Sequence, residues 1–188
     1  PDQGCYFWTG TTWEERAQRS WQSPGFAQTN RHPVLCVAFA DAKAYAAWAA
    51  TYDGETAALG YLLPFLITGW VTRYVPAGQG PLLDAGCGTG LTGPQLKALG
   101  YHDIAGLDLS KDMLAIAGSR QVYNDLREAA LGGPLPWPDG HFRAFFSTGV
   151  FTIGHAPASG LHELVRITAK GGHAIFTVRD QVFEKGGF

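Results

Sequence analysis

The sequence is poor in cysteine, in charge of either sign and in long apolar runs. Its three cysteines have no CxxC spacing, so we expect no disulfide framework, no metal site and a reducing, cytoplasmic location. The apolar run Val34–Ala40 is far shorter than the roughly 20 residues that a membrane-spanning helix needs. The chain has 14 basic and 16 acidic residues, and no basic stripe in the sequence indicates a nucleic-acid partner. The composition therefore favours a soluble globular protein whose ligands are small molecules.

The chain divides near residue 38. Residues 1–38 contain three of the six tryptophans and no sustained periodicity, so we interpret them as an extension of unclear role. Residues 39–188 form one predicted domain that begins with two helices. Asp41 is a plausible N-cap for a helix ending near Tyr52, before the helix-breaking pair Asp53-Gly54. A second helix is expected over 55–74, with a kink or boundary at Pro64.

Beyond Gly80, short apolar strands alternate with helical segments. The expected strands cover 81–85, 103–108, 121–123, 142–147 and 173–179, and the expected helices cover 91–99, 110–117 and 158–168. This alternation predicts an α/β fold, a Rossmann-like doubly wound parallel sheet covered on both faces. The two earlier helices are predicted to cap its site.

A glycine-rich turn after the first of these strands is the sharpest signal. Leu82 to Ala85 ends a buried strand, Gly86 to Gly90 forms the turn, and a helix follows. Glycine permits backbone geometries closed to other residues and lets a ligand approach the main chain. The next strand ends at Asp108, 20 residues after Gly88, where a carboxylate can accept both ribose hydroxyls of an adenosine ligand.

A dinucleotide site is the rival interpretation, because Gly88 to Gly93 matches GxGxxG. In such a site the first glycine closes the strand directly, whereas here the turn has begun by Gly86. Asp84 would also place a carboxylate near the diphosphate and repel it. The carboxylate instead suits a ligand that carries an ammonium and a sulfonium. A tight turn without any ligand is the third interpretation.

Residues 83–90 resemble motif I of the class I S-adenosylmethionine-dependent methyltransferases. Residues 106–114, 134–142 and 161–178 resemble the later motifs of that family in the correct order. Residues 45–53 and 149–155 are similar to the methyltransferase-like proteins of the Williams–Beuren syndrome region. The family fold normally continues with a helix and two more strands after the fifth strand, so we expect a domain incomplete at its C-terminus with an exposed sheet edge.

The resemblance implies that S-adenosylmethionine is the cofactor and assigns roles by position. The glycine loop would hold the methionine portion, Asp108 the ribose, and residues near 109–113 and 130–131 the adenine. Thr148 and Gly149 would border the methyl group, and Tyr52 would fold over the cofactor. The full predicted cofactor set is Tyr52, Asp84, Ala85, Gly86, Cys87, Gly88, Thr89, Gly90, Asp108, Leu109, Met113, Ala130, Leu131, Thr148 and Gly149.

Several single residues have two interpretations. His155 is either a general base or a loop histidine that shapes the pocket. Cys87 is either a nucleophile or a small residue that fills the turn. Asp125 competes with Ala130 for the adenine edge, although its distance from the Pro-Trp-Pro stretch favours Ala130.

The resulting functional hypothesis is methyl transfer to a small-molecule acceptor. The alternatives are a non-catalytic module that binds S-adenosylmethionine or S-adenosylhomocysteine, and an NAD(P)-dependent oxidoreductase. The expected partners include neither nucleic acid nor membrane, and the open sheet edge suggests a homodimer.

Overall fold

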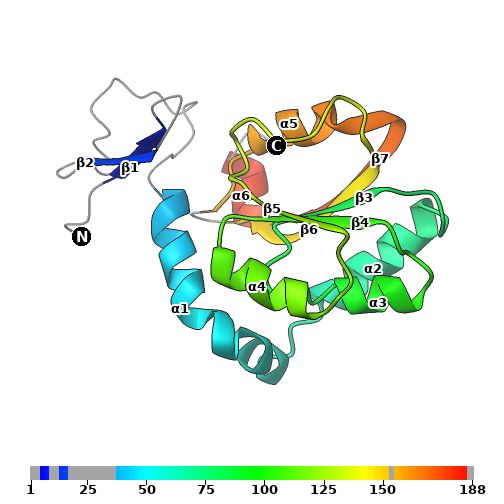
Figure 1. Ribbon diagram of the computed structural model, residues 1–188, viewed down its shortest axis with the longest axis horizontal. Helices are drawn as coiled ribbons and strands as arrows, with labels where there is room; N and C mark the ends of the chain where they lie inside the picture. The colour runs from blue at the N-terminus through cyan, green and yellow to red at the C-terminus, as the bar shows by residue number, and fades with distance from the viewer. Residues whose placement is uncertain (1–4, 9–12, 17–36, 153–154, 186–188) are drawn as a thin grey trace.

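The structure is a computed structural model that describes residues 5–8, 13–16, 37–152 and 155–185 (Figure 1). Near the N-terminus, β1 (Cys5–Trp8) and β2 (Trp13–Arg16) pair antiparallel, with Cys5 opposite Arg16. The sequence predicted no regular structure in this segment, so the hairpin is an addition to the expected fold.

Five parallel strands form the main sheet, in the order β5-β4-β3-β6-β7. They are β3 (Leu82–Ala85), β4 (Ile104–Asp108), β5 (Asp125–Glu128), β6 (Phe142–Phe151) and β7 (Thr168–Val178). Side chains of successive residues enter opposite cores: Leu82 belongs to one buried cluster and Leu83 to the other. This period of two with both faces buried is what a parallel sheet between helical layers requires.

Helices cover both faces of the sheet (Figure 1). The chain folds into α1 (Val37–Ala58), α2 (Leu63–Tyr74), α3 (Gly93–Ala98), α4 (Lys111–Ser119), α5 (Gly160–Arg166) and α6 (Asp180–Lys185). Ile67 of α2 and Leu96 of α3 enter one core, and Leu164 of α5 enters the other. The predicted doubly wound α/β fold is confirmed.

The helix boundaries before the sheet differ from the prediction. Asp53-Gly54 does not end α1, because a single helical glycine costs only about 1 kcal/mol and Thr56 Oγ1 donates to Tyr52 O at 2.7 Å across this point. The helix instead ends before Gly60, whose φ of 69° ordinary residues rarely adopt. Pro64 lies in the first turn of α2, where its missing N–H has no helical partner to lose.

The third strand of the sheet was expected at 121–123 but lies at β5. Gln121 has a φ of 54° and belongs to the turn after α4. Val122 is buried because it packs in the core beside α3, and the strand itself begins with the polar residue Asp125. An edge strand can contain fewer apolar residues than a central one. The apolar residues Val122 and Tyr123 therefore indicated the wrong position for this strand.

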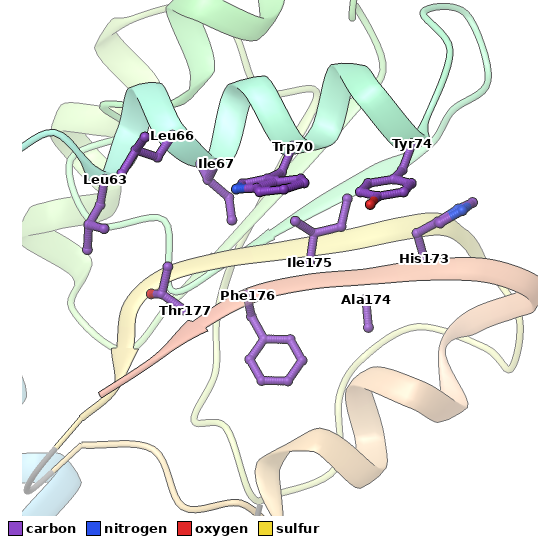
Figure 2. A pocket seen from close by; sticks show the side chains of 10 residues that line it. All are labelled: Leu63, Leu66, Ile67, Trp70, Tyr74, His173, Ala174, Ile175, Phe176 and Thr177. Atoms are coloured by element: carbon purple, nitrogen blue, oxygen red, sulfur yellow. The ribbon is translucent and has the colours of Figure 1, made fainter. Parts of the chain in front are cut away.

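An apolar groove of about 480 Å³ lies between α2 and β7 at the other edge of the sheet (Figure 2). Trp70 and Tyr74 stack with ring centroids 6.0 Å apart, and Tyr74 lies at the same distance from the ring of His173. Leu66 is 57% exposed beside them. No residue of the glycine loop lines this groove, although its lining residue Thr177 accepts from Gly149 N at 3.0 Å.

Candidate functional site

The glycine loop connects the end of β3 to the start of α3, and it lies beside the end of β4. Gly86, Gly88 and Gly90 have φ values of 78°, 55° and 80°, which explains the residue type at each position. The amides of Gly86 and Cys87 both donate to Leu107 O, at 2.7 and 2.9 Å. These bonds fix the loop to the end of β4, so the two predicted motifs meet at one edge of the sheet.

Two glycines of this loop have different surroundings. A Cβ on Gly86 would lie 2.3 Å from Val150 Cγ2, so close packing against the end of β6 requires glycine there. A Cβ on Gly88 would meet nothing within 4 Å. The backbone at Gly88 therefore faces open space, which is the access that a ligand cradle needs.

Asp108 faces the same loop from the tip of β4. Its Oδ2 accepts from Gly88 N at 2.8 Å, and its Oδ1 accepts from Ser110 N at 2.9 Å. Burial raises the pKa of this carboxyl, while the backbone hydrogen bonds oppose the rise. A carboxylate has about four acceptor positions, and the backbone amides of Gly88, Leu109 and Ser110 face this one, so acceptor capacity remains for a ligand hydroxyl.

Asp84 lies behind the loop and is only 2% exposed. Its Oδ2 accepts from Tyr123 Oη at 2.7 Å. Burial raises the pKa of Asp84 to about 7, and the hydrogen bond from Tyr123 only partly counteracts the burial. From this position the side chain can influence a bound cation through its charge, with the loop backbone between them.

Cys87 fills the turn. The side chain is 8% exposed, and burial, reinforced by the charges of Asp84 and Asp108, raises the pKa of the thiol well above its ordinary value. A thiol that stays protonated at neutral pH is a poor nucleophile. The geometry favours the interpretation of Cys87 as a small packing residue.

The residues predicted to line the adenine differ in burial and in position. Leu109 follows β4 and is half-buried, whereas Met113 belongs to α4 and is 1% exposed. Leu131 packs against the core beneath α5. Ala130 follows the end of β5, on the ligand side of the sheet. Asp125 lies at the opposite end of that strand and accepts from Trp137 Nε1 at 3.3 Å, which removes it from the site.

The end of β6 brings together Thr148, Gly149 and a residue that the sequence analysis missed, Tyr61. A Cβ on Gly149 would lie 2.7 Å from Tyr61 Oη. Burial raises the pKa of Tyr61, and a side-chain hydrogen bond with Thr148 opposes that rise. His155 follows in the next turn, where its amide donates to Thr152 O at 3.2 Å. The preceding residues 153–154 lie outside the described part of the chain.

A second missed group ties α1 to the glycine loop. Asp53 accepts from Thr89 Oγ1 at 2.6 Å and forms an ion pair with Arg120 at the end of α4. Tyr52, its neighbour, is half-buried and packs edge-to-face against Trp48 with ring centroids 4.6 Å apart. Asp53 ends the segment 45–53 that resembles the family, but Arg120 stands in no motif, and their separation of 67 residues hides the contact from the sequence.

The described residues contain no group of three or more His, Cys, Asp or Glu side chains that could hold a metal ion. Within the same residues, no helix has both the length and the apolarity needed to cross a membrane.

Comparison with known families identifies the domain that contains this candidate site. The methyltransferase domain family matches residues 83–176, which is half of the chain and contains the glycine loop, Asp108 and the end of β6. The chain belongs to this methyltransferase family. The predicted family and its cofactor, S-adenosylmethionine, are thereby confirmed. A second, shorter match joins residues 3–67 to the sulfatase-modifying factor enzyme 1-like domain.

Individual relatives of this methyltransferase domain support the family assignment. Human methyltransferase-like protein 27 is 36% identical over 141 residues, covering 72% of this chain and 56% of the relative. The yeast 18S rRNA (guanine(1575)-N(7))-methyltransferase is 42% identical over 66 residues, 35% of this chain and 24% of that protein. The chain thus spans about half the length, or less, of these relatives.

Solved structures share the fold. A Haloferax volcanii methyltransferase in complex with the Trm112 methyltransferase activator superposes with a TM-score of 0.60 at 22% identity. The match covers 71% of this chain and 59% of that one. At this identity the likeness concerns the fold alone.

The predicted partners are wrong. Relatives from yeast, Dictyostelium discoideum, Arabidopsis thaliana and Bos taurus are named 18S rRNA methyltransferases, and a structural neighbour was solved with a protein activator. These findings overturn the expectation of a small-molecule acceptor without nucleic acid and of a homodimer through the sheet edge. Net charge is an average over the chain, so it carries little information about which partners the chain binds.

Proposed function

We propose that this chain is the cofactor-binding core of an S-adenosylmethionine-dependent methyltransferase that modifies a nitrogen of an RNA base, assisted by a partner protein. The observation that carries the cofactor half of this proposal is the pairing of the glycine loop with Asp108 through Gly88 N. The names of the 18S rRNA methyltransferase relatives support the acceptor half.

The residues of the site fit the cofactor. Open space faces the Cα of Gly88, and Asp108 keeps acceptor capacity beside it. Asp84 adds a buried carboxyl group behind the loop, and its ionised form favours a cationic ligand over a diphosphate. S-adenosylmethionine supplies an electrophilic methyl group on a sulfonium sulfur.

The remaining work of the chain is orientation. The loop and Asp108 would hold the methionine and ribose portions, and Thr148 and Gly149 would border the methyl group. Tyr61 covers the end of β6 with its hydroxyl near Gly149. Holding two reactants in line and excluding water can contribute about 7–11 kcal/mol to lowering the barrier, so methyl transfer demands little acid–base chemistry from the protein.

Calorimetric titration tests the cofactor half. S-adenosylmethionine and S-adenosylhomocysteine should bind, whereas NAD should give no heat. Asp108→Ala should weaken binding about ten- to hundredfold, because each charge-assisted hydrogen bond is worth about 1.5–3 kcal/mol. The matched control is Asp139→Asn, which removes an exposed carboxylate far from the loop. Unchanged affinity in Asp108→Ala, or binding of NAD, would refute the assignment.

Transfer of tritiated methyl groups tests the acceptor half. The protein is incubated with labelled S-adenosylmethionine and unfractionated RNA, protein and metabolite extracts, with and without a cell lysate that supplies partners. The proposal expects label that nuclease treatment removes. Label resistant to nuclease assigns another acceptor class, and binding without any transfer supports a non-catalytic cofactor-binding module.

A further inference from the structure

The hydroxyl and the backbone carbonyl of Thr89 both form hydrogen bonds with residues from outside the glycine loop. Its hydroxyl donates to Asp53 Oδ1 at 2.6 Å, and its carbonyl accepts from Arg120 Nε at 2.5 Å. The side chain is 1% exposed. Thr89 therefore has no free side-chain hydrogen for a ligand, although the sequence placed it among the cofactor-binding residues.

Asp53 and Arg120 complete a closed set of contacts. The other carboxylate oxygen of Asp53 accepts from Arg120 Nη2, so the aspartate joins α1 to α4 and to the loop at once. The side chains of Asp53 and Arg120 are 40% and 23% exposed. Charge-assisted bonds with such partial burial are stronger than those of fully exposed pairs.

The three residues come from three separate segments. Figure 1 shows α1 beside α4, and hydrogen bonds to Thr89 join Asp53 of α1 and Arg120 at the end of α4 to the loop. Local propensity explains none of these contacts, because α1 would form a helix without Asp53 reaching the loop. The contacts hold α1, at Asp53, to Thr89 in the middle of the glycine loop.

We propose that Asp53, Thr89 and Arg120 form a latch that fixes α1 over the cofactor loop, and that Asp53 is the positioning residue of this latch. The inference rests on the proposed function, because it is the cofactor that the fixed loop and helix would retain. The latch acts on retention: a ligand beneath α1 leaves only when α1 separates from the loop, so breaking the latch raises the dissociation rate.

Three substitutions separate the latch from general stability. Asp53→Asn removes the charge that pairs with Arg120 and keeps the size of the side chain. Thr89→Val removes the hydroxyl and keeps the volume, whereas Thr89→Ser keeps the hydroxyl and loses only a methyl group. Asp139→Asn neutralises an aspartate of another Asp–Arg pair, with Arg166, away from the loop.

The primary measurement is the dissociation rate of S-adenosylhomocysteine, by stopped-flow displacement. Asp53→Asn and Thr89→Val should each release the ligand about tenfold faster, the effect of losing one charge-assisted hydrogen bond. Thr89→Ser and Asp139→Asn should stay within about twofold of the wild-type rate. In a double variant, Asp53→Asn with Thr89→Val, the rate should rise by much less than the product of the single effects, because both break one network.

Hydrogen exchange of the ligand-free protein gives a readout independent of the cofactor. Asp53→Asn should speed amide exchange in the last turns of α1 and in residues 86–90 together. Wild-type dissociation rates in Asp53→Asn and Thr89→Val would overturn the latch, as would equal acceleration in Asp139→Asn. If the wild-type protein binds no S-adenosylhomocysteine, the proposed function fails, and unchanged exchange in both segments would then overturn the latch separately.

Discussion

Asp84→Asn should make the protein more stable at neutral and alkaline pH. The carboxyl of Asp84 is 2% exposed and has a pKa raised from 3.8 to about 7 by burial. The folded protein therefore holds this proton more tightly than the unfolded chain. The stability that Asp84 contributes is fully present below pH 4 and is lost as the pH rises through 7.

The magnitude follows from the two pKa values. One pKa unit corresponds to about 1.4 kcal/mol. Between pH 5 and pH 8 the contribution of Asp84 to the free energy of unfolding should fall by about 2–3 kcal/mol. Asparagine has no charge to lose, and its side-chain oxygen can still accept from Tyr123 Oη, so the variant should lack this decline.

Urea unfolding of both proteins at pH 5, 6, 7 and 8 gives the test. The difference in unfolding free energy between Asp84→Asn and the wild type should shift in favour of the variant by about 2–3 kcal/mol across this range. Taking the difference cancels every group that titrates equally in the two proteins. A difference that is independent of pH would show that Asp84 is already ionised at pH 5 in the folded state and would refute the reasoning.

Two further substitutions and one modification test the geometry around the loop. Gly149→Ala should lower the free energy of unfolding by about 1–3 kcal/mol, since its φ is 69° and the new Cβ would lie 2.7 Å from Tyr61 Oη. Adding Tyr61→Phe should recover part of that loss in urea unfolding, because only the steric component disappears; a double variant no more stable than Gly149→Ala would contradict this. Cys87 should resist iodoacetamide at pH 8 in the folded protein and react after unfolding, because burial raises its thiol pKa. Peptide mapping by mass spectrometry distinguishes it from the other cysteines, and rapid native labelling would refute the assignment of Cys87 as a packing residue.

The cofactor loop and its carboxylate partner could be predicted because their geometry depends on contiguous residues. The positive φ values at positions 86, 88 and 90 favour glycine, so the spacing of the glycines indicates the backbone conformation of the loop. Asp108 could be placed beside the loop because parallel neighbouring strands end at the same edge of a sheet. The structure bears this out through the hydrogen bond from Gly88 N to Asp108.

Prediction from the sequence was weaker wherever a side chain contacts a residue that is distant in the sequence. Val122 and Tyr123 looked like a strand because they are apolar, yet they line the space beside Gly93, whose Cβ would lie 3.0 Å from each side chain. Asp53-Gly54 looked like a helix end, yet Asp53 has an ion-pair partner 67 residues away in Arg120. Local patterns describe what a residue prefers, and tertiary contacts of this kind override such preferences.

The same distinction explains why the sequence identified the cofactor and left the acceptor unidentified. The proposed cofactor site consists largely of backbone atoms of one loop, which leave a glycine pattern. In the proposed function, Thr148 and Gly149 on one element and Tyr61 on a connection before α2 would border the methyl group, and side chains at such positions follow no fixed spacing. An acceptor as large as RNA adds a further step, because a partner protein can supply the positive surface that this chain, with 14 basic and 16 acidic residues, does not show in its composition. The acceptor must therefore be found by following the transferred methyl group.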